Sequence, residues 1–86
     1  MDYKEFMDKV HRERIEQDYK WGVQNHSPEK WVSILGEEYG SVCKAINQRD
    51  IKRVEAELIQ VVAVCKLMID CIDLDKALQT NIWKGE

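Results

Sequence analysis

The chain has 86 residues, of which 44% are hydrophobic and 34% charged, with four glycines and one proline. This length suffices for one domain, and chains of this size often gain stability by associating. The net charge of −3 excludes the basic surface with which proteins neutralise nucleic-acid phosphates, so no nucleic-acid partner is expected. Low glycine and proline content favours helix over sheet. We expect residues 1–86 to form a single all-α domain.

The sequence shows no feature of membrane insertion or export. It contains no run of about 18 apolar residues, so no segment is expected to span a membrane. The stretch MDYKEFMDKV at the start is charged throughout and lacks the apolar centre of a signal peptide. Cys43, Cys65 and Cys71 form no CxxC motif and are typical of buried hydrophobic side chains in a reducing compartment. The expected location is the cytoplasm.

The first predicted helix runs from about Asp2 to Lys20. Its apolar residues have helical spacing: Tyr3, Phe6, Met7 and Val10. Gly22, directly after Trp21, is typical of a helix that ends in a left-handed residue. The residues VQNH that follow are expected to form the connection to a second helix.

Polar and aromatic side chains gather around this connection. Trp21, Asn25 and His26 could stack on a base or hydrogen-bond a phosphate, and the alternative is an aromatic anchor followed by polar turn residues. Lys20 could contact a phosphate, or could be an ordinary solvated lysine. The connection is therefore a candidate ligand site.

The second predicted helix has a clear start, because Ser27 can cap it and Pro28 suits the first helical position. Gly36 and Gly40 lie four residues apart inside this helix, where close contact with another helix would compensate for their low helix propensity. Its apolar stripe lacks a member at position 38 and consists of Trp31, Ile34, Leu35, Val42, Ala45 and Ile46.

Asp50 is expected to cap the third helix, which is apolar on more than one side. Its apolar residues are Val54, Leu58, Val61, Val62, Cys65, Met68, Ile69 and Ile72. Such a broad apolar surface indicates a central helix or one buried against another subunit, so we expect a dimer or tetramer. A short tail helix, from about Leu74 to Trp83, is expected to end the chain.

Acidic residues occupy the apolar stripes of two consecutive helices. Glu38 lies three residues after Leu35, and Glu57 lies three residues after Val54. Since the two helices are joined by a short connection and pack antiparallel, their inward carboxylates would share one neighbourhood. A cation is expected between them, and oxygen ligands favour Mg²⁺ or Mn²⁺. The alternative is that the acids at 37 and 38 pair with the basic side chains at 44, 52 or 53.

Three stretches, KWGVQNH, GEEYGSV and EAELIQVVAV, resemble the MazG-like all-α nucleotide pyrophosphohydrolases, particularly small phage-encoded members. The resemblance covers residues 12–69. It implies a helical bundle completed by oligomerisation, in the host cytoplasm if the chain is phage-encoded. It also implies Mg²⁺-dependent hydrolysis of a nucleoside triphosphate to a monophosphate and pyrophosphate.

The family signature is EExxE on one helix and ExxD on the next. Glu37 and Glu38 match its first two glutamates and carry the implied catalytic role, and Glu57 matches the glutamate of ExxD. Ser41 and Gln60 stand where the family has two further acids, so the implied metal ligands are Glu38, Glu57, Gln60 and Ser41. The implied nucleotide-binding residues are Lys20, Trp21, Asn25 and His26. The alternative function is a non-catalytic oligomeric protein that binds or sequesters a nucleotide.

Overall fold

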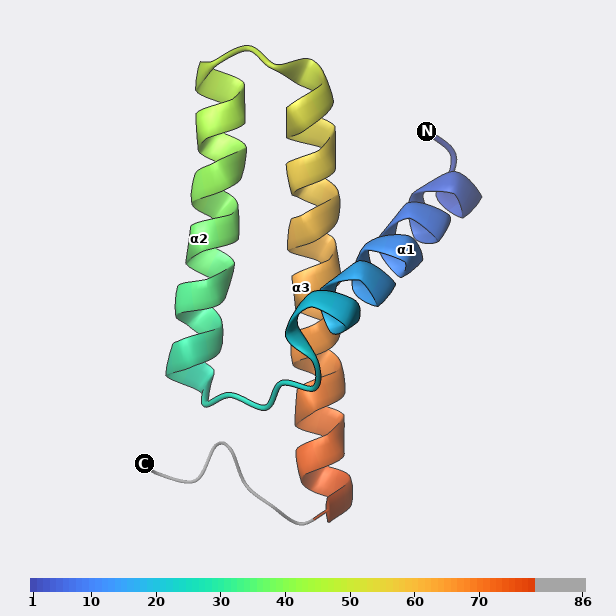
Figure 1. Ribbon diagram of the computed structural model, residues 1–86, viewed down its shortest axis with the longest axis vertical. Helices are drawn as coiled ribbons and strands as arrows, with labels where there is room; N and C mark the ends of the chain where they lie inside the picture. Colours follow the sequence, from blue (N-terminus) through green and yellow to red (C-terminus); the bar gives the residue numbers. More distant parts are fainter. Residues whose placement is uncertain (79–86) are drawn as a thin grey trace.

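The computed structural model describes residues 1–78, with side chains as far as Asp73, and this part consists of three helices. They are α1 (Tyr3–Trp21), α2 (Pro28–Asn47) and α3 (Ile51–Leu78). As Figure 1 shows, α2 and α3 form an antiparallel hairpin, and α1 crosses α3 obliquely. No strand occurs between residues 1 and 78, which confirms the all-α prediction for the described part.

Each helix begins at the residue that the sequence indicates. The side chains of Asp2, Ser27 and Asp50 each accept a hydrogen bond from the backbone N–H three residues later, at 2.8, 3.3 and 3.2 Å. These bonds satisfy donors that a helix N-terminus otherwise leaves without partners. At the end of α1, Gly22 has φ 70° and ψ −164°, a conformation outside the left-handed helical region that is open to little besides glycine.

The α2–α3 turn occupies only residues 48–50. The Asp50 N–H donates to the Ala45 carbonyl at 3.1 Å, and Gln48 donates to Lys44 at 3.0 Å. Arg49 takes the positive φ of 57° that this type of helix ending requires. The turn thereby satisfies the last carbonyls of α2 and reverses the chain within three residues.

The third helix is longer than the sequence pattern predicts. It continues without a break through Asp73 to Leu78, so the expected separate tail helix does not begin at Leu74. Nothing in this segment stops a helix, because it contains neither proline nor glycine. The remainder of the predicted tail, residues 79–86, lies outside the described part of the chain.

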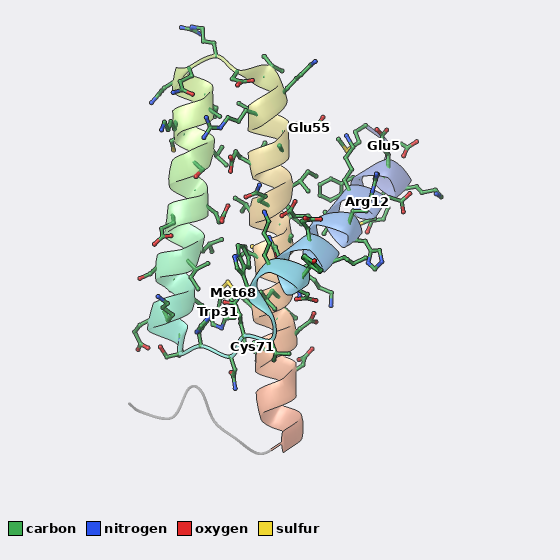
Figure 2. The ribbon with its side chains drawn as sticks, in the orientation of Figure 1. Glu5, Arg12, Trp31, Glu55, Met68 and Cys71 are labelled. Atoms are coloured by element: carbon green, nitrogen blue, oxygen red, sulfur yellow. The ribbon has the colours of Figure 1, made fainter. Side chains whose placement is uncertain are left out.

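The core consists of two apolar clusters that share α3. Between α2 and α3 the buried residues are Trp31, Val64, Leu67 and Cys71, and Met68 packs against them (Figure 2). Between α1 and α3 they are Val10, Ile59 and Ala63. Within the described residues α1 and α2 make no close backbone contact with each other. The predicted central position of α3 is therefore confirmed, since it is the common support of the other two helices.

The glycines of α2 do not have the expected close neighbour within this chain. A Cβ atom added at Gly36 or Gly40 would meet no atom within 4 Å. Several large apolar side chains are also exposed, among them Leu58 and Ile69 on α3 and Tyr39 on α2. Self-association stays a prediction, and these exposed positions are where a second copy would make contact.

None of the helices in the described part is both long and apolar enough to cross a membrane.

Candidate functional site

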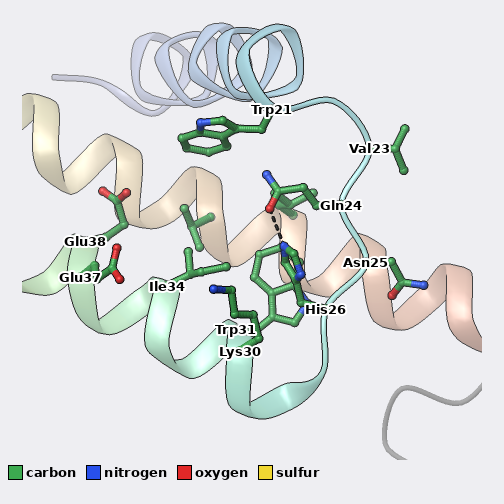
Figure 3. Close-up of a pocket in the computed structure, with 12 residues that line it drawn as sticks. Trp21, Val23, Gln24, Asn25, His26, Lys30, Trp31, Ile34, Glu37 and Glu38 are labelled. Atoms are coloured by element: carbon green, nitrogen blue, oxygen red, sulfur yellow. Dashed lines mark hydrogen bonds between the residues drawn. The ribbon is translucent and has the colours of Figure 1, made fainter.

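A pocket of about 690 Å³ lies between α2, α3 and the α1–α2 connection (Figure 3). It brings together five residues from the predicted nucleotide and catalytic sets, which are far apart in the chain: Trp21, Asn25, His26, Glu37 and Glu38. Sequence reasoning did not assign three further lining residues of α2 to a site, namely Lys30, Trp31 and Ile34. Val64 and Leu67 contribute the apolar wall on α3.

The α2 wall of this pocket is aromatic. Trp31 is 2% exposed, and the His26 ring meets it edge-on with ring centroids 4.9 Å apart. The indole Nε1 of Trp31 is buried without a hydrogen-bond partner. A hydrogen bond of 2.6 Å between His26 Nε2 and Gln24 Oε1 fixes the imidazole orientation. Trp21 lies across the pocket from this pair, at the end of α1 (Figure 3), so flat apolar surfaces flank the space between them.

Glu37 and Glu38 line the other end of the pocket (Figure 3). Burial raises the pKa of Glu38, and the negative charges of Glu57, Glu13 and Glu37 raise it further, in that order. Acids from all three helices therefore act on one half-buried carboxyl. The charge of Glu57 acts on Glu38 across the hairpin, but Glu38 lines the pocket and Glu57 does not. A shared site for the two carboxylates therefore stays a prediction.

Glu13 was not among the predicted site residues. Burial raises the pKa of Glu13, Lys20 lowers it, and Glu16 and Glu57 raise it. Its position three residues after buried Val10 places it on the inner face of α1, and this spacing is the sequence signal that identifies it. The acidic neighbourhood thus extends to α1.

The alternative pairing of Glu37 and Glu38 with nearby basic side chains is not observed, because neither forms an ion pair within residues 1–73. Arg53 instead approaches Glu57, with 3.6 Å between Nε and Oε1. The Glu57 side chain is 14% exposed. Arg53 therefore offsets part of the negative charge at Glu57, as Lys20 does at Glu13.

Ser41 and Gln60 are half-buried on α2 and α3, and neither lines the pocket. The Ser41 hydroxyl donates to the Glu37 carbonyl of its own helix at 3.3 Å. In the part of the chain that is described, no three His, Cys, Asp or Glu side chains are gathered closely enough to hold a metal ion. Proteins usually bind Mg²⁺ through only one or two carboxylates while water and substrate phosphates complete the shell, so the Mg²⁺ site stays a prediction.

The two lysines near the pocket differ in position. Lys20 is exposed in the last turn of α1 and does not line the pocket, whereas Lys30 in the first turn of α2 does. Lys30 precedes Ile34 by four residues, so both lie on the helix face that leads to Glu37 and Glu38. Lys30 is therefore the better candidate for a phosphate contact.

Comparison with protein-family models, curated proteins and solved structures finds no match to this chain. The resemblance to the MazG-like family accordingly stays a prediction.

Proposed function

We propose that the chain binds a nucleoside triphosphate in the pocket and, with Mg²⁺ or Mn²⁺, hydrolyses it to a nucleoside monophosphate and pyrophosphate. The observation that supports this proposal is that the pocket has an aromatic end and an acidic end. Trp21, Trp31 and His26 suit a base, while Glu37 and Glu38 stand at the opposite end. A volume of about 690 Å³ is in the usual range for small-molecule sites.

In this proposal the carboxylates of Glu38 and Glu57 hold the metal ion. The bound ion neutralises phosphate charge and makes a coordinated water more acidic. Glu37 lines the same end of the pocket and takes the proton released from the attacking water. Lys30 binds a phosphate oxygen, and the rings of Trp21 and His26 exclude water from the base.

A specific observation favours nucleotide binding without hydrolysis as the second candidate. Ser41 uses its hydroxyl within its own helix, and no third carboxylate takes its place on α2. Fewer carboxylates weaken divalent-ion binding. In this case the pocket sequesters a nucleotide and releases it unchanged.

Pyrophosphate release from a panel of ribo- and deoxynucleoside triphosphates, with and without Mg²⁺ or Mn²⁺, tests hydrolysis. Calorimetry with the same nucleotides tests binding. Metal-dependent release that Glu38→Gln abolishes and Glu29→Gln preserves would support the enzyme, because Glu29 is exposed and does not line the pocket. Binding without release supports the second candidate, and the absence of both contradicts the proposal.

The proposal includes self-association into a dimer or tetramer. Exposed Leu58 and Ile69 on α3 and the open glycine positions of α2 leave apolar surface that a second copy can cover. Sedimentation at micromolar concentration should show a dimer or larger species, and a monomer would contradict this part of the proposal.

A further inference from the structure

The α1–α2 connection, residues 22–27, is a thin wall with open space on both sides. Val23 and Gln24 line the main pocket, and they also line a second pocket of about 330 Å³ behind the connection. Gly22, Leu67 and Cys71 contribute to this second pocket. Because space lies on both faces of Val23 and Gln24, packing holds this part of the connection less firmly than it holds His26, which packs against Trp31.

One side-chain hydrogen bond ties this wall to α3. The Cys71 Sγ–H donates to Asn25 Oδ1 at 2.9 Å, across 46 positions of sequence. In the part of the chain described here, no other side-chain hydrogen bond joins residues 22–27 to α3. Figure 3 shows the Asn25 side chain on the outer side of the connection, away from Trp21 and Glu38. Figure 2 places Cys71 on α3 beside the connection.

We infer that the Asn25–Cys71 hydrogen bond is a latch that holds the pocket wall closed and thereby sets the affinity of the pocket for its ligand. The affinity part rests on the proposed nucleotide-binding function. Asn25 is then a positioning residue, with its amide oxygen engaged by α3 and not by a nucleotide. The latch acts on the ligand through the positions of its neighbours Gln24 and His26, which form the wall.

The chemistry of the latch makes it easy to open. A thiol is a weak hydrogen-bond donor, so this contact contributes less than an ordinary amide or hydroxyl bond. Since α1 and α2 make no close backbone contact with each other in the described residues, each helix holds its end of the connection only through its own packing on α3. Cys71 is only 4% exposed when the latch is closed. Its thiol is therefore accessible to a reagent only after the wall moves away.

Alkylation by iodoacetamide, with each cysteine quantified by peptide mass, measures this opening in the intact protein. Half-buried Cys43 and Cys65 serve as internal references. Asn25→Ala should raise the alkylation rate of Cys71 about two- to fivefold without ligand, the lower part of the range for the loss of one hydrogen bond, because the thiol is a weak donor. The reference cysteines should keep their rates, and the same reaction with Val32→Ala, an exposed position of α2 that lines neither pocket, should match the natural protein.

The second measurement is the dissociation constant for each of the four deoxynucleoside triphosphates with Mg²⁺. Asn25→Ala and Cys71→Ala should weaken binding about two- to fivefold, and Cys71→Ser should bind like the natural protein because the hydroxyl is also a donor. Thermal unfolding verifies that each variant is folded. An unchanged Cys71 alkylation rate in Asn25→Ala overturns the latch. A raised rate with unchanged affinity overturns its role in the pocket. If no nucleotide binds even the natural protein, the proposed function fails, while the alkylation rates still decide whether the latch exists.

Discussion

The Glu38 carboxyl on α2 has a pKa that burial raises and that the negative charge of Glu57 on α3 raises further. The two charges act on each other across the hairpin, whose register is set by a three-residue turn. Two like charges in this position cost free energy when both are ionised. A bound divalent cation or the loss of one charge would relieve this cost.

Replacing Glu38 should make the metal-free protein more stable at neutral pH. Folding raises the pKa of Glu38 above 4.5, so its contribution to stability is fully present below pH 4.5 and is lost as pH rises through the raised pKa. Glu38→Gln should therefore increase the free energy of unfolding in chelator at pH 7 and change it little at pH 4. Urea unfolding at both pH values measures this. Glu29→Gln should instead lower stability slightly at pH 7, because Glu29 lies at the positive end of α2. Equal effects of Glu38→Gln at both pH values would contradict a raised pKa of Glu38.

The two lysines should differ in their effect on nucleotide binding. Lys30→Ala removes the positive charge that lines the pocket and should raise the dissociation constant by about tenfold, the size expected for one charge-assisted hydrogen bond. Lys20→Ala removes the same charge from an exposed position outside the pocket and should change it by less than about twofold. Calorimetry measures both. A larger effect of Lys20→Ala would indicate that the phosphate contacts the end of α1 instead.

A carboxylate at position 41 should strengthen metal binding. Ser41→Glu adds an acid one turn after Glu38 and removes only the hydroxyl bond to the Glu37 carbonyl. The variant should bind Mg²⁺ or Mn²⁺ about tenfold more tightly, lose stability in chelator, and release more pyrophosphate. Asn47→Glu is the control, because it adds the same charge at the exposed end of α2. If both variants bind metal like the natural protein, position 41 does not face the ion.

Replacement of Gly40 and of Gly22 by alanine should change the free energy of unfolding in opposite directions. Gly40→Ala should raise the free energy of unfolding by about 0.5–1 kcal/mol, because the position is helical and open. Gly22→Ala should lower it by about 1–3 kcal/mol, because φ is 70° there. Chemical unfolding gives both values, and sedimentation shows whether Gly40→Ala weakens association. Destabilisation by Gly40→Ala together with loss of the oligomer would place position 40 in a helix–helix contact between copies.

The sequence predicts most of the fold because its signals are local. Caps such as Ser27 and Asp50 act within one turn, so the starts of α2 and α3 can be identified without knowledge of tertiary structure. The end of α3 is less predictable, since continuation to Leu78 depends on the absence of a stop signal. The spacing of apolar residues around Glu38 is also a local signal, and it predicts that Glu38 lies on the inward face of α2.

The rest of the candidate site depends on contacts between residues that are far apart in the sequence. Glu13 joins Glu38 and Glu57 only because α1 crosses α3, and neither its spacing nor its charge shows which helix it will face. Asn25 reads as a ligand contact in the sequence, whereas its partner is Cys71, 46 residues away. The residue types indicate which side chains belong to the candidate site, but their contact partners depend on how the helices cross.

The support of both α1 and α2 by α3 alone has a consequence for the order of folding. The α2–α3 hairpin closes through three residues, so its loop-closure entropy is small and it should form early. Docking of α1 must instead join residues 46 positions apart, such as Lys9 with Glu55. Within the described residues, we therefore expect the pocket to be assembled after the hairpin. A partially folded chain with an intact hairpin would have both acidic helices in place and still lack the wall that encloses a ligand.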